Sequence, residues 1–180
     1  MPKIHLVEGP VGAGKSTYCK VLAERTGGVH IALDEWFVRL FSPDRPDSDV
    51  ALWYVQRKAR LVDHIWQHTR ALLAAGATPI LELGLLQRQS RTDFYRRARD
   101  AGFEVQVYVL EASRDLRRAR VARRNEEKRP SFTLVVPEAF LELANNMWQS
   151  PDDVEVQENR IELISTPRAR KSSAPSFCSV

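Results

Sequence analysis

Residues 9–16 constrain this chain more than any other stretch. They read Gly-Pro-Val-Gly-Ala-Gly-Lys-Ser and satisfy the pattern G-x-x-x-x-G-K-[ST] in full. Residues 4–8 before them form a short apolar run that predicts a buried strand, and residues 17–24 after them have helical spacing. A strand, a glycine-rich turn and a helix are the context in which this pattern binds phosphate.

The chemistry of the loop follows from its residue types. Glycines let successive N–H groups turn inward as an anion nest, and the following helix adds its N-terminal dipole. Lys15 supplies a charge to the β- and γ-phosphates, and the Ser16 hydroxyl is a ligand for Mg²⁺. We therefore expect the chain to bind a nucleoside triphosphate through Gly9, Pro10, Val11, Gly12, Ala13, Gly14, Lys15, Ser16 and Thr17.

Composition predicts one intracellular domain. A chain of 180 residues, 43% of them hydrophobic, buries one good core. The two cysteines, Cys19 and Cys178, lie far apart, which argues against a disulfide framework and for a reducing compartment. A strand at the N-terminus leaves no room for a signal peptide, and no apolar run is long enough to span a membrane. We expect a cytoplasmic protein.

Most of the net charge lies at the C-terminus. The chain carries +4, of which Arg168, Arg170 and Lys171 contribute three charges in a segment without acids, residues 166–180. This segment is rich in Ser, Pro and Arg and is predicted to be a flexible basic tail. The remainder, residues 1–165, is nearly balanced, which favours a small-molecule partner over a nucleic acid, although a nucleic acid is not excluded.

Strands are expected to alternate with helices along residues 1–165. The strand candidates are 4–8, 29–33, 79–83, 105–110 and 160–164. A long helix between the second and third strands has an apolar stripe of Leu52, Val55, Ala59, Val62, Trp66, Thr69 and Leu73. A further helix is expected over residues 91–101. This alternation predicts an α/β fold with a parallel, doubly wound sheet, in which ligands bind at the carboxyl ends of the strands.

An acidic residue follows the second strand directly. Asp34 stands 19 positions after Lys15, one helix and one strand later, where a base would face the γ-phosphate. The alternative is that Asp34 only caps the next helix. Trp36 is a candidate for stacking on an acceptor, with a core position as the alternative.

The end of the third strand holds further candidates. Glu82 is placed to hold Mg²⁺ or its water shell, or else to pair with a neighbouring arginine. Gly84 would allow close backbone approach beside an acceptor. Arg88 and Arg91 are expected in a loop at the same edge, where they would hold the acceptor, unless they only begin a solvated helix.

Arginines crowd the segment after the fourth strand. Arg117, Arg120 and Arg124 share one face of a predicted helix, and Arg129 follows. We expect a lid over about residues 114–136 in which Arg120, Arg124 and Arg129 close on the triphosphate; a merely solvated helix is the alternative. His64 and His68 are four apart on the long helix but lack the glutamate of a zinc-protease motif.

The order of these features resembles that of small P-loop kinases. The resemblance rests on the phosphate loop, Asp34, the run Val-Tyr-Val-Leu-Glu-Ala at 107–112, the lid with Arg120 and Arg124-Asn125, and Pro-Asp-Asp-Val-Glu at 151–155. Over residues 3–165 the chain is similar to the group of zeta toxin, chloramphenicol phosphotransferase and polynucleotide kinase, ATP-binding proteins of the AAA_33 type. Shikimate and gluconate kinases are more distant.

The resemblance implies a fold and a reaction. It implies a three-layer P-loop fold with strand order 2-3-1-4-5, ATP and Mg²⁺ as cofactors, and transfer of the γ-phosphoryl group to a hydroxyl of an antibiotic, sugar or metabolite. Asp34 would be the general base, with Lys15, Arg120 and Arg124 stabilising charge. Two alternatives stay open: a 5′-hydroxyl polynucleotide kinase, and a nucleotide-dependent switch acting on a partner protein. The sequence does not specify the acceptor, and no oligomeric state follows from it.

Overall fold

A computed structural model describes residues 3–127 and 138–165 of the chain. Its centre is a five-stranded, fully parallel sheet in the order β2-β3-β1-β4-β5. The strands are β1 (Ile4–Glu8), β2 (Val29–Ala32), β3 (Pro79–Glu82), β4 (Val105–Glu111) and β5 (Glu162–Ser165). The predicted fold class and strand order are both confirmed, and the bounds of β1 are those expected from the sequence.

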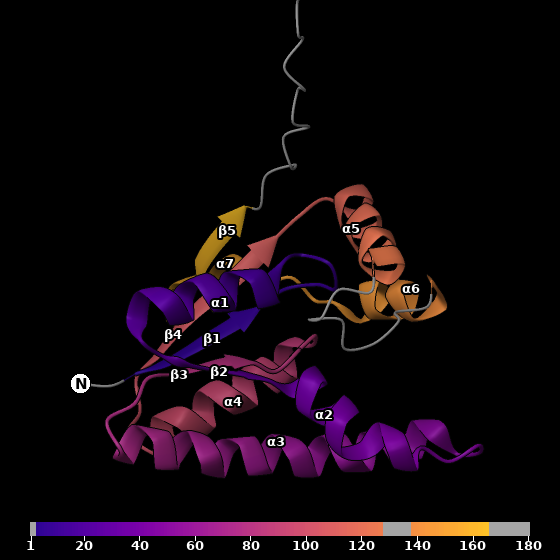
Figure 1. Cartoon of the computed structure of the whole chain (residues 1–180). Helices are drawn as coiled ribbons and strands as arrows, with labels where there is room; N and C mark the ends of the chain where they lie inside the picture. Colours follow the sequence, from indigo (N-terminus) through magenta and orange to yellow (C-terminus); the bar gives the residue numbers. More distant parts are fainter. Residues whose placement is uncertain (1–2, 128–137, 166–180) are drawn as a thin grey trace, which may run out of the picture.

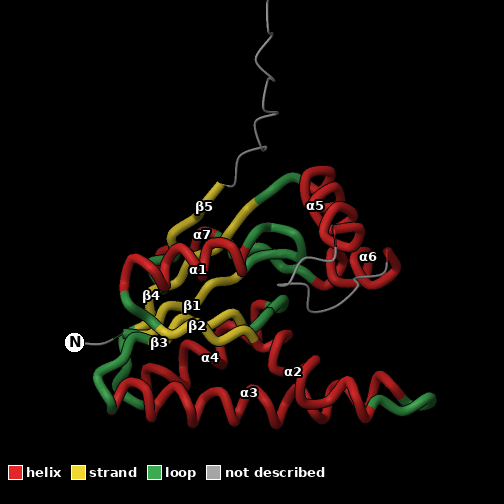
Figure 2. The backbone as a smooth tube through the Cα atoms, in the orientation of Figure 1, coloured by secondary structure: helices red, strands yellow, loops and turns green. Residues whose placement is uncertain are grey.

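Helices connect the strands and cover both faces of the sheet (Figure 1). They are α1 (Lys15–Thr26), α2 (Leu33–Phe41), α3 (Val50–Ala74), α4 (Arg88–Asp100), α5 (Arg114–Glu127), α6 (Glu138–Met147) and α7 (Asp153–Glu158), with a short 3₁₀ turn η1 (Ser42–Asp44). Helices α5 and α6 lie beside each other, beyond the ends of the central strands (Figures 1 and 2). The ligand-binding edge expected for a parallel sheet therefore faces these two helices.

Successive side chains of each strand point to opposite faces of the sheet, so the core around the sheet consists of two clusters, one on each face. In β1, Ile4 and Leu6 belong to the larger core cluster, which includes residues of α3 and α4. Val7 points the other way and packs with Cys19 and Leu22 of α1. Each face of a parallel sheet is covered because crossover helices lie on both sides, so β1 reads as a continuous buried run.

The long helix differs from expectation in its first half. Trp53 is buried there, whereas Leu52 and Val55 of the predicted stripe are about 60% exposed. Helix α2 packs against this part of α3, and Phe37 meets the rings of Trp53 and Tyr54. The buried face of the first half of α3 is therefore the one that carries Trp53 and Tyr54, which contact α2. Further along, the buried residues are Leu61, Ile65, Trp66, Thr69 and Leu73. Of the predicted stripe, Trp66, Thr69 and Leu73 are therefore buried, and Val62 packs partly buried against the same core.

Within the described residues, no helix combines the length and apolar character needed to cross a bilayer. Arg129, the lid residues 128–136 and the expected tail over residues 166–180 lie outside the described residues. The proposed boundaries of lid and tail therefore stay predictions.

Candidate nucleotide-binding site

The phosphate loop joins β1 to α1 through backbone positions that exclude side chains. Gly9 has a φ of 144°, and a Cβ there would stand 2.6 Å from the carbonyl oxygen of Leu110. A Cβ on Gly12 would stand 2.8 Å from the carbonyl oxygen of Arg117. Both approaches are to backbone atoms that do not move aside, so glycine is required for the turn to pack against β4 and α5.

Cationic side chains lie on the loop. The Lys15 ammonium donates to the carbonyl oxygens of Gly9 (2.9 Å) and Pro10 (3.2 Å). From α5, Arg120 donates to the carbonyl oxygen of Ala13 at 3.1 Å. Two of the residues expected to bind triphosphate are thus gathered at the same loop, from elements about a hundred residues apart in sequence.

Arg117, one turn before Arg120, was not expected to bind the nucleotide. Its guanidinium donates to the carbonyl oxygens of Val11 (3.4 Å) and Ala112 (3.2 Å) and to the side chain of Asn145 in α6. It thereby connects the loop to β4 and α6. The shared helical face of these arginines was visible in the sequence, but the contact to the loop backbone was not.

The two predicted magnesium ligands meet directly. Ser16, in the first turn of α1, donates a 3.0 Å hydrogen bond to Oε1 of Glu82 at the end of β3. The other carboxylate oxygen, Oε2, lies 3.2 Å from Nε2 of His30 on β2. Burial alone would raise the pKa of the Glu82 carboxyl, but the hydrogen bond from His30 and the charge of Lys15 lower it below its ordinary value.

This donor set fits Mg²⁺. A hydroxyl and an ionised carboxylate are hard oxygen ligands, and Mg²⁺ bound with a nucleotide usually takes one or two protein ligands of this kind. Glu82 is longer than the aspartate common in related proteins, and the structure nevertheless brings its oxygen to Ser16. The pairing with an arginine, the alternative considered for Glu82, is replaced by the pairing with His30.

Asp34 lies in the first turn of α2, directly beyond the end of β2. It does not cap the helix, because Ala32 occupies the N-cap position. Part of the Asp34 side chain is exposed to solvent. Surrounding protein atoms nevertheless reduce the hydration of its carboxylate, which raises its pKa, and the negative charge of Glu82 raises the pKa further. The charges of Lys15, Lys58 and Arg124 oppose that shift. These interactions put Asp34 within electrostatic range of the loop lysine.

Two residues of α3 interact electrostatically with Asp34 and were missed in the sequence. Lys58 is one of the charges that lower its pKa, and Tyr54 has its own pKa raised to about 12 by burial and by the charge of Asp34. The Lys58 ammonium lies 6.0 Å from the centre of the Tyr54 ring. From the sequence we predicted only an apolar stripe for α3, because a polar pair four residues apart on a helix is too common to indicate a site.

Two arginines predicted to bind the acceptor have other surroundings. Arg91 was expected in a loop; it lies in α4, is fully buried and forms a two-pronged ion pair with Glu155 (2.6 and 2.8 Å). This corrects the assignment, because its guanidinium is already enclosed by protein. Arg88 is half-exposed and pairs with Asp152, the cap of α7.

Trp36 turns toward α3. Its ring lies 6.5 and 5.7 Å from those of His64 and His68, and it packs against the larger core cluster. The core position that we considered as the alternative describes it better than stacking on an acceptor. Gly84 has a φ of 60° with open space around a Cβ, and its place beside an acceptor stays a prediction.

An open hollow of about 480 Å³ adjoins the loop on the side of β4 and β5. Its lining comes from the loop, the β4–α5 connection, the end of β5 and the segment after α6: Pro10, Glu111, Ala112, Ser113, Arg117, Trp148, Ser150 and Ser165. Of these only Pro10 had been expected to take part in the site. The other lining residues belong to no recognisable motif, and they lie together only because the fold brings their separate segments to the same end of the sheet.

Solved structures share this architecture. A sugar kinase from Janibacter sp. is 18% identical, with a TM-score of 0.60 and 92% of this chain and 85% of that chain covered. A gluconokinase from Sinorhizobium meliloti is 20% identical, with a TM-score of 0.55 and coverage of 94% and 85%. Kti12 from Chaetomium thermophilum, in complex with ADP-AlF3, is 16% identical, with a TM-score of 0.66 and coverage of 90% and 88%. At these identities the likeness concerns the fold.

Curated protein sequences provide no significant match to the chain. A family model described as an AAA domain, AAA_33, matches residues 4–146. The matched segment begins with β1 and the phosphate loop and continues through Asp34, Glu82, the arginines of α5 and most of α6. With its P-loop and kinase-like sheet order, the chain therefore belongs to the AAA domain family AAA_33.

Proposed function

We propose that the protein is an ATP- and Mg²⁺-dependent phosphotransferase that moves the γ-phosphoryl group of ATP to a hydroxyl of a small molecule. The observation that carries this proposal is the position of Asp34 at the end of β2, within electrostatic range of Lys15 and Glu82. A nucleotide-binding protein needs no carboxylate there, whereas a kinase needs one to orient and deprotonate the attacking hydroxyl.

The loop and α5 would hold the triphosphate. Incoming phosphate oxygens offer Lys15 and Arg120 a stronger partner than the loop carbonyls they now contact, so these cations would turn to the nucleotide. Ser16 and Glu82 would hold Mg²⁺, which neutralises charge on the β- and γ-phosphates when bound. Arg124, whose charge lowers the pKa of Asp34, would act near the transferred group.

The nucleoside would lie in the hollow beside Pro10. That hollow adjoins the phosphate loop on the side away from Asp34 and is bordered by Arg117 and Trp148. A planar base stacks favourably on an aromatic ring or a guanidinium. The triphosphate would then run from the hollow along the loop toward Asp34, which leaves the acceptor on the α2–α3 side.

The side proposed for the acceptor receives a positive charge from Lys58 of α3. Tyr54 and Lys58 interact electrostatically with Asp34 and offer a hydroxyl and an ammonium. These groups suit a hydroxylated small molecule, including one with an anionic substituent. The nearly balanced charge of residues 1–165 supports a small acceptor over a polynucleotide.

The test is phosphoryl transfer from ATP across a panel of sugars, hydroxylated antibiotics and 5′-hydroxyl oligonucleotides. We expect transfer to one small-molecule class, and a loss of roughly 10²- to 10⁴-fold in Asp34→Asn with nucleotide affinity retained. Glu35→Gln is the matched control, because Glu35 is the next residue and pairs with Arg39 on its own helix. Its rate should stay near that of the unchanged protein.

Each alternative has its own signature in the same assay. Transfer to the oligonucleotides alone would identify a polynucleotide kinase and overturn the small acceptor. A nucleotide-dependent switch would be favoured if the rate of ATP hydrolysis did not change with any acceptor and was the same in Asp34→Asn as in the unchanged protein. Equal transfer by both proteins to the true acceptor would remove Asp34 as the base while leaving the kinase activity in place.

A further inference from the structure

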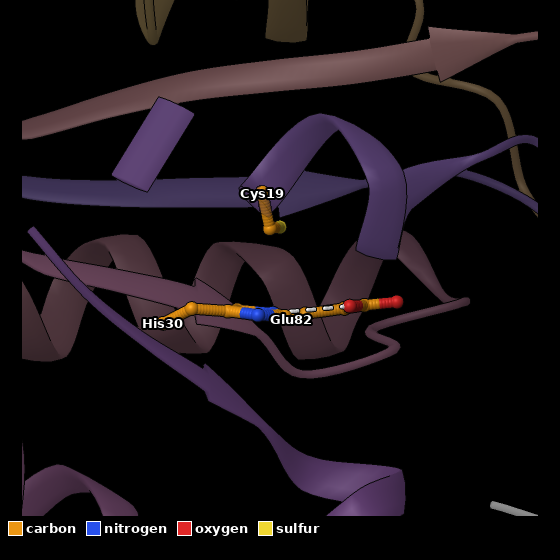
Figure 3. A group of neighbouring side chains, drawn as sticks. All are labelled: Cys19, His30 and Glu82. Atoms are coloured by element: carbon orange, nitrogen blue, oxygen red, sulfur yellow. Dashed lines mark hydrogen bonds and ion pairs between the residues drawn. The ribbon is translucent and has the colours of Figure 1, made fainter. Parts of the chain in front are cut away.

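A cluster of three metal-binding side chains lies beneath the phosphate loop. The Sγ atom of Cys19, a ring nitrogen of His30 and a carboxylate oxygen of Glu82 all lie within 4.8 Å of one another. Figure 3 shows His30 and Glu82 end to end, with the Cys19 side chain directed toward them from α1. Phosphoryl transfer requires neither the thiol nor the imidazole.

The fold brings these residues together from three elements. Strands β2 and β3 pair with Ala32 opposite Glu82, and His30 lies two residues before Ala32, so its side chain points to the same face of the sheet. Helix α1 contacts both strands on that face and contributes Cys19. The arrangement is therefore fixed by the sheet register and by the first crossover helix.

The spacing suits a tetrahedral ion. Nε2 of His30 and Oε2 of Glu82 are 3.2 Å apart. Two ligands of those types on Zn²⁺ stand about 3.4 Å apart, given bonds of about 2.1 Å at a tetrahedral angle. The Sγ atom of Cys19 must move roughly an ångström closer to the other two ligand atoms to complete a tetrahedral set. Zinc accepts sulfur, imidazole and carboxylate ligands together, whereas Mg²⁺ takes oxygen.

We propose that Cys19, His30 and Glu82 form a binding site for Zn²⁺ or a similar thiophilic divalent cation. The ion would insert between Nε2 and Oε2, with His30 as a neutral imidazole. Binding would form a metal–sulfur bond and release the thiol proton of Cys19 to solvent. Three protein ligands leave the fourth position to water. Cys19 is fully buried, but His30 and Glu82 are partly exposed, so the ion enters from their side.

Occupation of this site would affect the magnesium site, a consequence that rests on the proposed function. Glu82 presents Oε1 to Ser16 and Oε2 to His30. A thiophilic cation on Oε2 withdraws negative charge from the carboxylate and so weakens Mg²⁺ on Oε1. By linkage, bound Mg²⁺-nucleotide weakens the thiophilic ion to the same extent. The site would therefore make nucleotide binding sensitive to zinc.

Co²⁺ is the probe, because a tetrahedral cobalt–thiolate site has a sulfur-to-metal charge-transfer band and intense visible absorption. The full chain is titrated with Co²⁺ in a Cys178→Ser background, which leaves Cys19 as the only thiol. We expect both signals at one ion per chain and their displacement by Zn²⁺. Cys19→Ser should abolish the charge-transfer band, and His30→Gln should weaken binding by at least about tenfold.

His68→Gln is the matched control, because His64 and His68 form a second, thiol-free pair on α3. Its cobalt–thiolate band should match that of the parent. Two results would refute the proposed site: Co²⁺ binding to the parent without a cobalt–thiolate band, or a His30→Gln variant that keeps the band and binds Co²⁺ with full affinity. These readouts need no ATP and no acceptor, so their failure is separate from failure of the kinase proposal. Zinc that weakens Mg²⁺-nucleotide binding equally in parent and Cys19→Ser would refute the linkage.

Discussion

The Ser16 hydroxyl donates a 3.0 Å hydrogen bond to Oε1 of Glu82, which joins the first turn of α1 to the end of β3. These two groups come from the predicted phosphate loop and from the predicted acidic strand end, 66 residues apart. If these two groups hold Mg²⁺ as we propose, their contact gives the site a defined geometry before nucleotide binds, because His30 holds the second carboxylate oxygen.

The first prediction concerns magnesium. Glu82→Gln keeps the size of the side chain and removes its charge, so the Mg²⁺-dependent gain in ATP-analogue affinity should fall by roughly 10- to 100-fold. Affinity in EDTA should change little, since Lys15 and the loop backbone bind phosphate without the metal. Calorimetric titration with and without Mg²⁺ measures both. Glu104→Gln, an exposed acid just before β4, is the control; an equal loss in EDTA would refute the assignment.

The second prediction concerns the acid side of the pH–rate profile. The base must be ionised, and loss of hydration with the charge of Glu82 raises the pKa of Asp34 above its ordinary value of 3.8. Activity should therefore fall with decreasing pH at a higher pH than for an ordinary aspartate. Lys58→Gln removes a charge that lowers this pKa, so the acid limb should move upward. An unmoved limb in kcat/KM would mean that another group titrates.

The third prediction concerns the buried ion pair between α4 and α7. Arg91 is enclosed by Glu155, by the carbonyl oxygens of Leu85 and Leu86 at 3.5 and 3.4 Å, and by the Trp148 ring. Arg91→Ala removes both close hydrogen bonds to the buried Glu155 carboxylate and leaves it only Arg88, at 3.9 Å, as a cationic neighbour, so it should cost about 3–5 kcal/mol of unfolding free energy. Urea denaturation measures it.

Arg88→Ala is the matched control for this pair. Arg88 lies one turn earlier on α4; its nearer partner Asp152 is half-exposed, and Glu155 lies farther away, at 3.9 Å. Its loss should cost at most about 1 kcal/mol. Equal costs for the two variants would contradict the structural role that we assign to Arg91.

Local sequence patterns predicted the sheet and the phosphate loop because their causes are local. The run of residues 4–8 and the glycine-rich turn that follows it each carry their own signal. Arg91 shows the limit: its partner Glu155 is 64 residues away, and an arginine near a strand end looks the same whether it is buried or free. The same holds for Cys19 and His30, whose neighbourhood depends on the pairing of β2 with β3.

The remaining differences between the sequence-based predictions and the structure arise from where the helices begin and how they pack. Because α2 begins at Leu33 and its N-cap is Ala32, Asp34 falls inside the first turn, two residues past the capping position. Because α2 then packs on α3, Trp53 becomes part of the core and Tyr54 comes next to Asp34. The side that we propose for the acceptor is therefore formed by helix packing, which residue types along the chain do not specify.

The last prediction concerns Glu8, a fully buried carboxyl at the end of β1. Its Oε2 accepts from the backbone N–H of Leu85 at 2.9 Å, whereas Oε1 has no partner among the described residues. Burial raises the pKa of Glu8 from 4.5 to about 7, against the charges of Lys15 and Arg91. Between those values the unfolded chain ionises first, so Glu8 lowers stability as pH rises, by up to roughly 3 kcal/mol above pH 7.

Glu8→Gln removes this titration and keeps an acceptor for Leu85. Its stability relative to the unchanged protein should rise between pH 5 and pH 8, as measured by urea unfolding without nucleotide. Glu8→Leu is the companion variant: it shares the loss of titration but leaves the Leu85 N–H unpaired, which adds a pH-independent cost of about 1–3 kcal/mol. The two variants should therefore run parallel against pH with a constant offset. A Glu8→Gln difference that is the same at both pH values would mean that Glu8 is ionised in the fold throughout, held by Lys15 and Arg91 rather than by a proton.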